Sequence, residues 1–174
     1  MTIEIIPIRL EHVERFHRAL DIVARERRYL AMLQAPPLND TRKFVSTCVE
    51  KGYPQSAAIE SGELIGGCDI IPPETASALH CGALGMWVVP EKRSQGLGRQ
   101  LLLTTLAAAR EFGLMRVELG VYDDNLPAIR LYESLGFQRE GIKRNAALID
   151  GFYKNLIMMA IIDFDRWTAP GAKT

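Results

Sequence analysis

The residues best suited to chemistry lie in a glycine-containing loop near the middle of the chain. A segment typical of a strand ends at Pro90, and the sequence QGLG of residues 95–98 then leads directly into an apolar-periodic helix. Glycines let backbone N–H groups approach an anion closely, and the free N–H groups of a helix N-terminus attract negative charge. Lys92 and Arg93 add positive charge beside the loop. We therefore expect a bound phosphate or pyrophosphate here; the alternative is a plain glycine-rich turn before a surface helix.

Two better-known phosphate motifs do not fit this loop. The sequence contains no G-x-x-x-x-G-K-[ST] string, and Leu101 stands where G-x-G-x-x-G requires its last glycine. The loop also follows a predicted hairpin in mid-chain, whereas the dinucleotide fingerprint follows a first parallel strand. The pattern therefore predicts neither a P-loop site nor a dinucleotide site.

A second distinctive segment covers residues 125–137. It begins with Asn125, continues as a short predicted helix and ends in Leu-Gly-Phe, with the glycine where a helix C-terminal cap is expected. Tyr132 lies on this helix beside Leu131 and Leu135. By spacing alone, Tyr132 is better explained as a core aromatic of an amphipathic helix than as a reactive group.

Hydrophobic periodicity predicts the elements that hold both segments. Helices are expected from residue 10 to about residue 28, from residue 39 or 40 onward, and over residues 95–112 and 125–135. The second helix would have Asn39 or Asp40 as its N-cap and its inner face at Phe44, Val45, Cys48 and Val49. Strands are expected over residues 2–9, 56–61, 64–71, 80–89, 115–121, 137–148 and 152–163. The order βααβββαβαββ predicts a single α/β domain over residues 1–174 with a mixed, mostly antiparallel sheet flanked by helices.

Composition narrows the class of protein. The 174 residues include 21 Lys and Arg against 21 Asp and Glu, so the formal net charge is zero, whereas nucleic-acid-binding domains are usually basic. The N-terminus does not resemble a signal peptide, and the apolar run Leu156–Ile162 is far shorter than the ~20 residues that span a bilayer. Neither a nucleic acid nor a membrane is an expected partner. Cys48, Cys68 and Cys81 form neither a disulfide framework nor a zinc clip, so we expect reduced buried thiols, a cytoplasmic protein and no metal.

Together the two segments resemble the GNAT superfamily of acetyl-CoA-dependent N-acetyltransferases. Residues 93–98, RSQGLG, match the family pattern R/Q-x-x-G-x-G/A, and residues 125–137 match its second segment, an asparagine, an aromatic-bearing helix and Leu-Gly-Phe. The resemblance covers essentially the whole chain, because the predicted element order is also that of the family. It implies a sheet that is splayed at its central strands and a role for acetyl-CoA as cosubstrate.

The resemblance also implies roles for individual residues. The backbone N–H groups of the loop would hold the pyrophosphate of coenzyme A, the strand at residues 86–88 would pair with the pantetheine arm, and one N–H there would face the thioester carbonyl. Tyr132 would lie near the sulfur as general acid, because a phenol with a pKa of about 10 can share a proton with a thiolate whose free pKa is about 8.5. The implied cofactor-binding residues are Met86, Trp87, Val88, Arg93, Ser94, Gln95, Gly96, Leu97, Gly98, Arg99 and Asn125.

The acceptor and the general base stay open at this point. Glu118, Asp123, His80 and a water chain are all candidates for the base. The resemblance implies that residues 25–38 and 143–153 recognise the acceptor. Within them, Arg25, Arg27 and Arg28 either pair with a carboxylate of the acceptor or form a solvated basic helix end, and Tyr29 and Phe152 either line a pocket or only pack. A small-molecule amine or amino acid derivative is the first expectation, a protein N-terminus or lysine the second, and a non-catalytic acyl-CoA-binding module the third. The apolar run at residues 156–162 is typical of a strand buried on both faces, so we expect a homodimer to cover the second face; helices of the same chain are the alternative cover.

Overall fold

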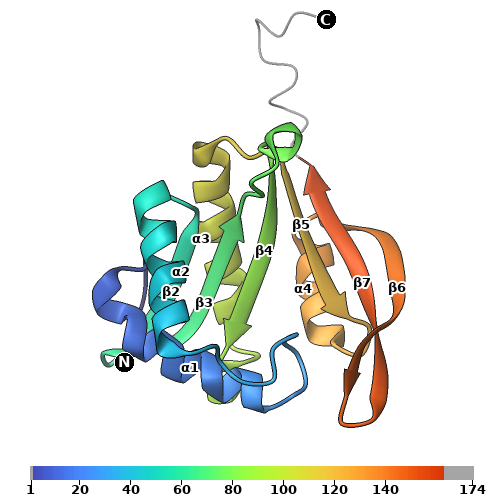
Figure 1. Cartoon of the computed structure of the whole chain (residues 1–174), viewed down its shortest axis with the longest axis horizontal. Helices are drawn as coiled ribbons and strands as arrows, with labels where there is room; N and C mark the ends of the chain where they lie inside the picture. The colour runs from blue at the N-terminus through green and yellow to red at the C-terminus, as the bar shows by residue number, and fades with distance from the viewer. Residues whose placement is uncertain (1, 163–174) are drawn as a thin grey trace, which may run out of the picture.

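The computed structural model describes residues 2–162 and shows helices on both faces of one open sheet (Figure 1). The helices are α1 (Val13–Arg25), α2 (Leu38–Lys51), α3 (Leu97–Phe112) and α4 (Leu126–Ser134). The strands are β1 (Ile3–Ile6), β2 (Gln55–Glu60), β3 (Glu63–Ile71), β4 (Cys81–Val88), β5 (Arg116–Tyr122), β6 (Gln138–Ile149) and β7 (Phe152–Ile162). The predicted order βααβββαβαββ is therefore confirmed.

The sheet has seven strands in the order β1-β2-β3-β4-β5-β7-β6. Every neighbouring pair is antiparallel except β4 with β5. A parallel pair needs a crossover connection, and α3 supplies it behind the sheet. The prediction of a mixed, mostly antiparallel sheet is confirmed.

The parallel pair β4 and β5 separates soon after it begins. Residues 81–83 pair with residues 116–118, and no pair follows, although both strands continue. Figure 1 shows the two strands diverging toward their C-terminal ends. The residues of β4 beyond Ala83 thus have β3 on one side and an open edge on the other. This is the splay that the family resemblance implied.

The two faces of the sheet are covered by different helices, with α1 and α2 on the front face of Figure 1 and α3 and α4 on the back. On the front, Trp87 of β4 meets the ring of Phe16 of α1 edge-on, with ring centroids 5.3 Å apart. On the back, the side chain of Leu101 of α3 fills the space beside Gly66, where an added Cβ would lie only 2.9 Å from its Cδ1. Side-chain alternation along β3 and β4 therefore divides their residues between two separate packing layers.

Several predicted boundaries were wrong, for local reasons. Helix α2 begins at Leu38 with Pro37 at the N-cap position, two or three residues ahead of the expected N-cap Asn39 or Asp40. Proline suits a helix start because it needs no N–H partner there. Two of the four residues assigned to its inner face, Phe44 and Val49, are 36% and 45% exposed. Helix α3 begins at Leu97 rather than residue 95, because Gly96 adopts a left-handed conformation. The first strand ends at Ile6, directly before Pro7.

The final hairpin is built as predicted, with Asp150 and Gly151 in its turn. Strand β7 lies between β5 and β6, so its backbone is paired on both sides. On one face of its apolar run Ile157 and Met159 are buried. On the other face Ala160 is buried, but Leu156 and Met158 are only half-buried and Ile162 is 39% exposed. The homodimer stays a prediction.

The three cysteines are free thiols in or near the interior of the protein. Cys48 and Cys68 are buried, Cys81 is half-buried, and all three are free. Burial raises the pKa of both Cys48 and Cys68 to about 12, so these thiols are protonated and unreactive at neutral pH. Within residues 2–162, no helix has the length and apolar character needed to cross a membrane.

Two buried threonines allow a test of how a hydrogen bond to a buried hydroxyl affects the stability of the protein. The hydroxyl of Thr41 in α2 is buried and has no hydrogen-bond partner among the described residues, whereas that of Thr105 in α3 donates to the carbonyl of Leu101 at 2.8 Å. We expect Thr41→Val to raise the free energy of unfolding by about 1 kcal/mol and Thr105→Val to lower it by about the same amount. Urea unfolding monitored by circular dichroism measures both. A loss of stability in Thr41→Val would show that its hydroxyl is satisfied after all.

Candidate active site

The loop between β4 and α3 presents free backbone donors. Ser94 and Gly96 both have positive φ, 59° and 80°, which turns successive N–H groups toward one side. Within the part of the chain that the structure describes, no backbone N–H from residue 94 to residue 99 has a hydrogen-bond partner. The 16-residue helix α3 begins inside this stretch and adds the positive end of its dipole. The loop thus has the donors and the charge that an anionic phosphate requires.

The basic side chains beside the loop, Lys92 and Arg93, bind other residues of the same chain. The Arg93 guanidinium donates to both carboxylate oxygens of Glu26, donates from Nε to the Val88 carbonyl at 2.9 Å, and lies over the Tyr29 ring. Lys92 forms an ion pair with Glu60 at 2.5 Å. These side chains therefore hold the loop in place rather than offering free charge to a ligand. Arg99, in the first turn of α3, makes no ion pair with any residue that the structure describes, and its side chain is exposed.

Of the three β4 residues of the predicted site, Trp87 points to the front face, and Met86 and Val88 point to the back. Trp87 is buried on the front face, where its ring packs against Phe16 of α1. Met86 is directed to the back, where its Cε lies 3.7 Å from the position of a Cβ built on Gly98. Val88 has its carbonyl occupied by Arg93. The unpaired main chain of β4 and the phosphate loop are therefore adjacent, as a ligand bound to both would need.

The strands β4 and β5 diverge and leave a gap between them, which we call the gap. Helix α4 places Asn125 and Tyr132 on the side of the gap opposite β4. The Asn125 Oδ1 caps the helix by accepting from the N–H of Ala128 at 3.3 Å, and its amide nitrogen has no acceptor within residues 2–162. Tyr132 is 7% exposed, packs against Phe137, and has no hydrogen bond from its hydroxyl within residues 2–162. Burial raises the pKa of Tyr132 above its usual value, so it is a proton donor and not a base at neutral pH.

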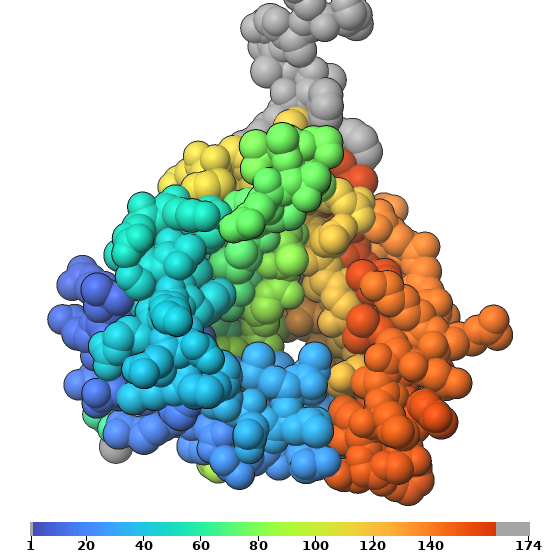
Figure 2. Space-filling view, viewed as in Figure 1, coloured from blue at the N-terminus to red at the C-terminus, as the bar shows by residue number. Residues whose placement is uncertain are grey.

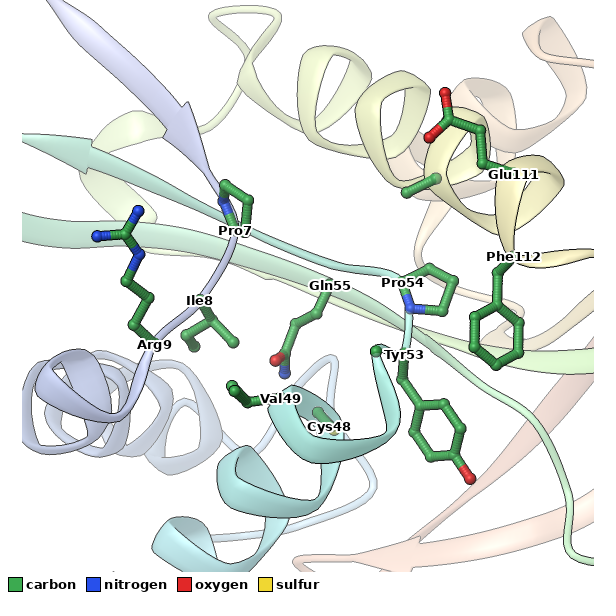
Figure 3. A pocket seen from close by; sticks show the side chains of 12 residues that line it. Pro7, Ile8, Arg9, Cys48, Val49, Tyr53, Pro54, Gln55, Glu111 and Phe112 are labelled. Atoms are coloured by element: carbon green, nitrogen blue, oxygen red, sulfur yellow. The ribbon is translucent and has the colours of Figure 1, made fainter.

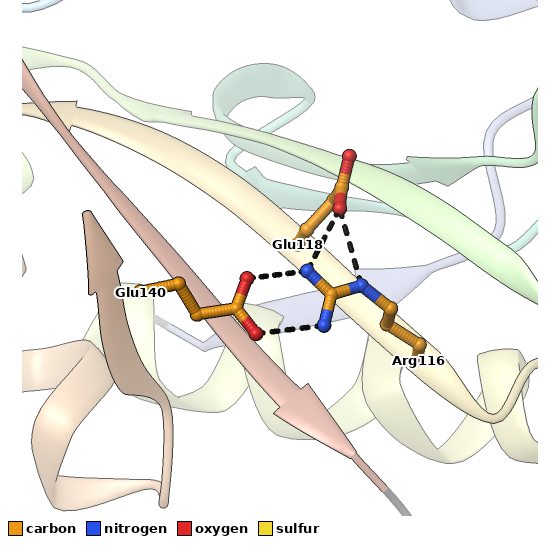
Figure 4. Close-up of polar contacts among 3 residues, drawn as sticks. All are labelled: Arg116, Glu118 and Glu140. Atoms are coloured by element: carbon orange, nitrogen blue, oxygen red, sulfur yellow. Dashed lines mark hydrogen bonds and ion pairs between the residues drawn. The ribbon is translucent and has the colours of Figure 1, made fainter. Parts of the chain in front are cut away.

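Each side chain that the sequence offered as a general base either has a hydrogen-bond partner or lies away from the open edge of β4. On β5, the Glu118 Oε2 accepts from Arg116 Nε at 3.2 Å, and the same guanidinium also binds Glu140 of β6 (Figure 4). Asp123 accepts from the Asn155 side chain at 2.8 Å and is exposed. His80 precedes the first residue of β4, at the paired end of β4 and β5 and away from the open edge.

Sequence analysis missed one acidic residue at the gap, Asp69 of β3. It lies among apolar neighbours and directly opposite Gly85 of β4. Its burial raises the pKa of the carboxyl to about 7. The available signal was an aspartate in the otherwise apolar strand segment LIGGCDII, which a buried strand normally excludes.

The front face is hollowed between β4, β5 and the segment that follows α1 (Figure 2). This segment reaches across to the final hairpin: Arg27 pairs with Asp150 at 2.5 Å, and the Lys154 ammonium donates to the Arg28 carbonyl at 3.2 Å. The two regions expected to recognise an acceptor are thus in contact. Of the arginine cluster, Arg25 pairs with Asp21 and Arg27 with Asp150, whereas Arg28 makes no ion pair within the described residues.

A second hollow, of about 510 Å³, lies at the other edge of the sheet between the ends of α2 and α3 (Figure 3). Its lining includes Arg9, Tyr53, Gln55 and Phe112 but no residue of the loop or of α4. It is therefore separate from the candidate site. In the part of the chain that the structure describes, no three His, Cys, Asp or Glu side chains gather in a way that would hold a metal ion.

Comparison with known proteins agrees with this geometry. Residues 17–137 match the model of the Acetyltransferase (GNAT) family, which is more than half of the chain. L-amino acid N-acetyltransferase AaaT of Escherichia coli is 27% identical over 133 residues, covering 76% of this chain and 82% of that protein. Mycothiol acetyltransferase of Thermobispora bispora is 56% identical over 52 residues, but these cover only 30% of this chain and 18% of that protein.

The fold is also found among solved structures. YncA of Salmonella typhimurium, solved with its cofactor acetyl-CoA, superposes with a TM-score of 0.87 at 18% identity, covering 93% of this chain and 94% of that one. The splayed sheet, the loop at the start of α3 and the family match define an acyl-transferring enzyme of one class. The chain belongs to the GNAT acetyltransferase family.

Proposed function

We propose that this protein transfers the acetyl group of acetyl-CoA to the primary amine of a small molecule or amino acid derivative. The observation that carries the proposal is the run of free backbone N–H groups at residues 94–99 beside the open edge of β4. The free N–H groups would hold the pyrophosphate of acetyl-CoA, and the open edge of β4 would pair with its pantetheine arm. Gly98 fits this arrangement because a Cβ there would lie 3.4 Å from Leu131 and 3.7 Å from Met86, between the loop and the gap.

The chemistry follows from the positions around the gap. A neutral amine that enters from the front face attacks the acetyl carbonyl within a ternary complex. A main-chain N–H of β4 near residues 86–88 would stabilise the oxygen that becomes negative, and one such donor can contribute ~3 kcal/mol. Tyr132, protonated and without a hydrogen-bond partner in the described chain, would donate its hydroxyl proton to the departing sulfur.

A small acceptor with a carboxylate is supported by the charge around the hollow. Arg28 lies in the segment that borders the hollow and makes no ion pair within residues 2–162. A guanidinium binds a carboxylate with two parallel hydrogen bonds. The relative AaaT is named as an L-amino acid N-acetyltransferase, which points the same way. We also infer a reducing compartment such as the cytoplasm, because the three cysteines are free.

The decisive experiment is a panel of amino acids, other small amines and short peptides with free N-termini. Each is mixed with protein and acetyl-CoA, and release of free thiol is measured. We expect turnover with one or more small amines, and faster turnover with those that carry a carboxylate. Turnover with peptides alone would replace the small acceptor by a protein one. Binding of acetyl-CoA without turnover on any amine would instead support a non-catalytic binding module.

A further inference from the structure

The carboxylate of Asp69 is free on the front face of the sheet. It lies on β3, in the layer that Trp87 and α1 share, because Asp69 and Gly67 point to the same side and Gly67 abuts the Trp87 ring. Within residues 2–162 no hydrogen bond or ion pair reaches its oxygens, and the side chain is only half-buried. A partly buried carboxylate without a partner is costly to a fold, so its position calls for an explanation.

Gly85 lets this carboxylate reach the gap. Asp69 is paired in register with Gly85, and a Cβ built on Gly85 would lie 3.1 Å from Oδ1 and 3.4 Å from Oδ2. The oxygens therefore lie over β4 in the space that a side chain at residue 85 would fill. Gly85 is two residues beyond Ala83, the last β4 residue paired with β5, which is about 7 Å along a strand. The Asp69 oxygens thus lie over Gly85, the first front-facing residue of β4 beyond its pairing with β5.

The other acidic side chains near this point, unlike Asp69, have hydrogen-bond partners. Glu118 faces the front at the end of the paired region, but the Arg116 guanidinium holds its Oε2. Asp123 is bound by the side chain of Asn155. These hydrogen bonds occupy carboxylate oxygens that an acceptor ammonium would have to reach. Asp69 is the carboxylate at the gap that has no such competitor within the described chain.

We propose that Asp69 is the general base that accepts a proton from the acceptor ammonium. This inference rests on the proposed function and names a further catalytic residue for it. The ammonium gives one proton to the Asp69 carboxylate, and the neutral amine then forms the nitrogen–carbon bond to the acetyl carbonyl. When the carbon–sulfur bond breaks, the sulfur leaves with the electron pair and takes the Tyr132 proton. Tyr132 regains a proton from the amide nitrogen, and Asp69 releases its own to water.

The surroundings of Asp69 suit this task. The titratable groups that interact with it are Cys48 of α2 and Cys68 of β3, whose burial keeps both thiols neutral. Within residues 2–162 no cation pairs with the Asp69 carboxylate, and burial raises its pKa to about 7. A base is most effective when its pKa is near the working pH, since an ordinary aspartate at about 3.9 would hold a proton too weakly.

Asp69→Asn tests the proposal with an amine that the wild-type protein acetylates. We expect turnover to fall by about 10²-fold, the usual scale for one general base, while calorimetry shows unchanged acetyl-CoA affinity. The wild-type rate should fall below about pH 7 as Asp69 becomes protonated, and this acid limb should be lost in the variant. Glu118→Gln is the matched control and should keep the limb. A wild-type limb that persists in Asp69→Asn would overturn the proposal, whereas a wild-type protein inactive on every amine would overturn the proposed function instead.

A second comparison separates proton removal from structural damage. An alkylamine acceptor is paired with the O-alkylhydroxylamine of the same shape, which is already neutral at pH 7 and needs no base before attack. We expect Asp69→Asn to slow the alkylamine about 10²-fold and the hydroxylamine by far less. Equal losses on both acceptors would mean that Asp69 only maintains the shape of the site.

Stability gives a readout that needs no acceptor. Because the folded-state pKa of Asp69 is raised, ionisation opposes folding, so this group destabilises the protein progressively from about pH 4 to pH 7. Asp69→Asn should therefore gain unfolding temperature relative to wild type over that range and keep the gain above pH 7. A variant less stable than wild type at pH 8 would show a structural role and contradict the proposal.

Discussion

Gly98→Glu is expected to abolish acetyl-CoA binding, with no heat of binding in calorimetry at concentrations that saturate the wild-type protein. Gly98 is the second residue of α3, and a Cβ there would point between Met86 and Leu131, toward the gap. A glutamate would carry its charge into the space that the pyrophosphate and the start of the pantetheine arm need. Its carboxylate would also bind the free N–H groups of residues 94–99 from within the chain.

The loss should come from the site and not from the fold. A Cβ at residue 98 meets its neighbours at ordinary contact distances, and an acidic side chain in the first turn of a helix stabilises it. Gly98→Ala is therefore expected to bind acetyl-CoA nearly as wild type does. Gly98→Gln has the size of glutamate without its charge and should bind weakly but measurably. Unchanged affinity in Gly98→Glu would remove the pyrophosphate from this loop.

The parts of the site that depend on nearby residues were predictable from the sequence. The proline, the glycines and the apolar period of residues 90–112 predicted a strand, a loop and a helix, and the structure has β4, a loop and α3 there. Anion binding by this loop stays a prediction. The glycine at residue 96 is required by its positive φ, which is a local property. Residues 125–137 likewise formed the predicted short helix, with Asn125 capping it.

The parts that depend on distant residues were not predictable. Arg93 was assigned to the phosphate because it is basic and adjacent, but its partner Glu26 lies 67 residues earlier in the chain. Asp69 faces the gap only because the register of β3 against β4 sets it opposite a glycine. A shift of one residue would send its side chain to the other face. Spacing along one strand contains no information about that register.

Tyr132→Phe is expected to lower turnover by about 10²-fold at saturating acceptor while leaving acetyl-CoA affinity unchanged. The change removes only the hydroxyl, and that hydroxyl has no hydrogen bond within the described residues, so the ring should keep its packing against Phe137. The unfolding temperature should therefore not fall. Without the phenol, the sulfur must leave as an unprotonated thiolate or wait for a proton from water.

The pH dependence distinguishes this role from that of a base. Because burial raises the pKa of Tyr132, the phenol stays protonated beyond the usual tyrosine range near 10, so Tyr132 should add no alkaline fall in the wild-type rate between pH 7 and about pH 9. Tyr122→Phe is the matched control, since Tyr122 is also buried, with its pKa raised by burial, but it lies on β5 beneath the Lys154 ammonium. Stopped-flow measurement of thiol release compares the two variants. If both turn over at the wild-type rate, another group or water protonates the thiolate, and Tyr132 is only part of the core.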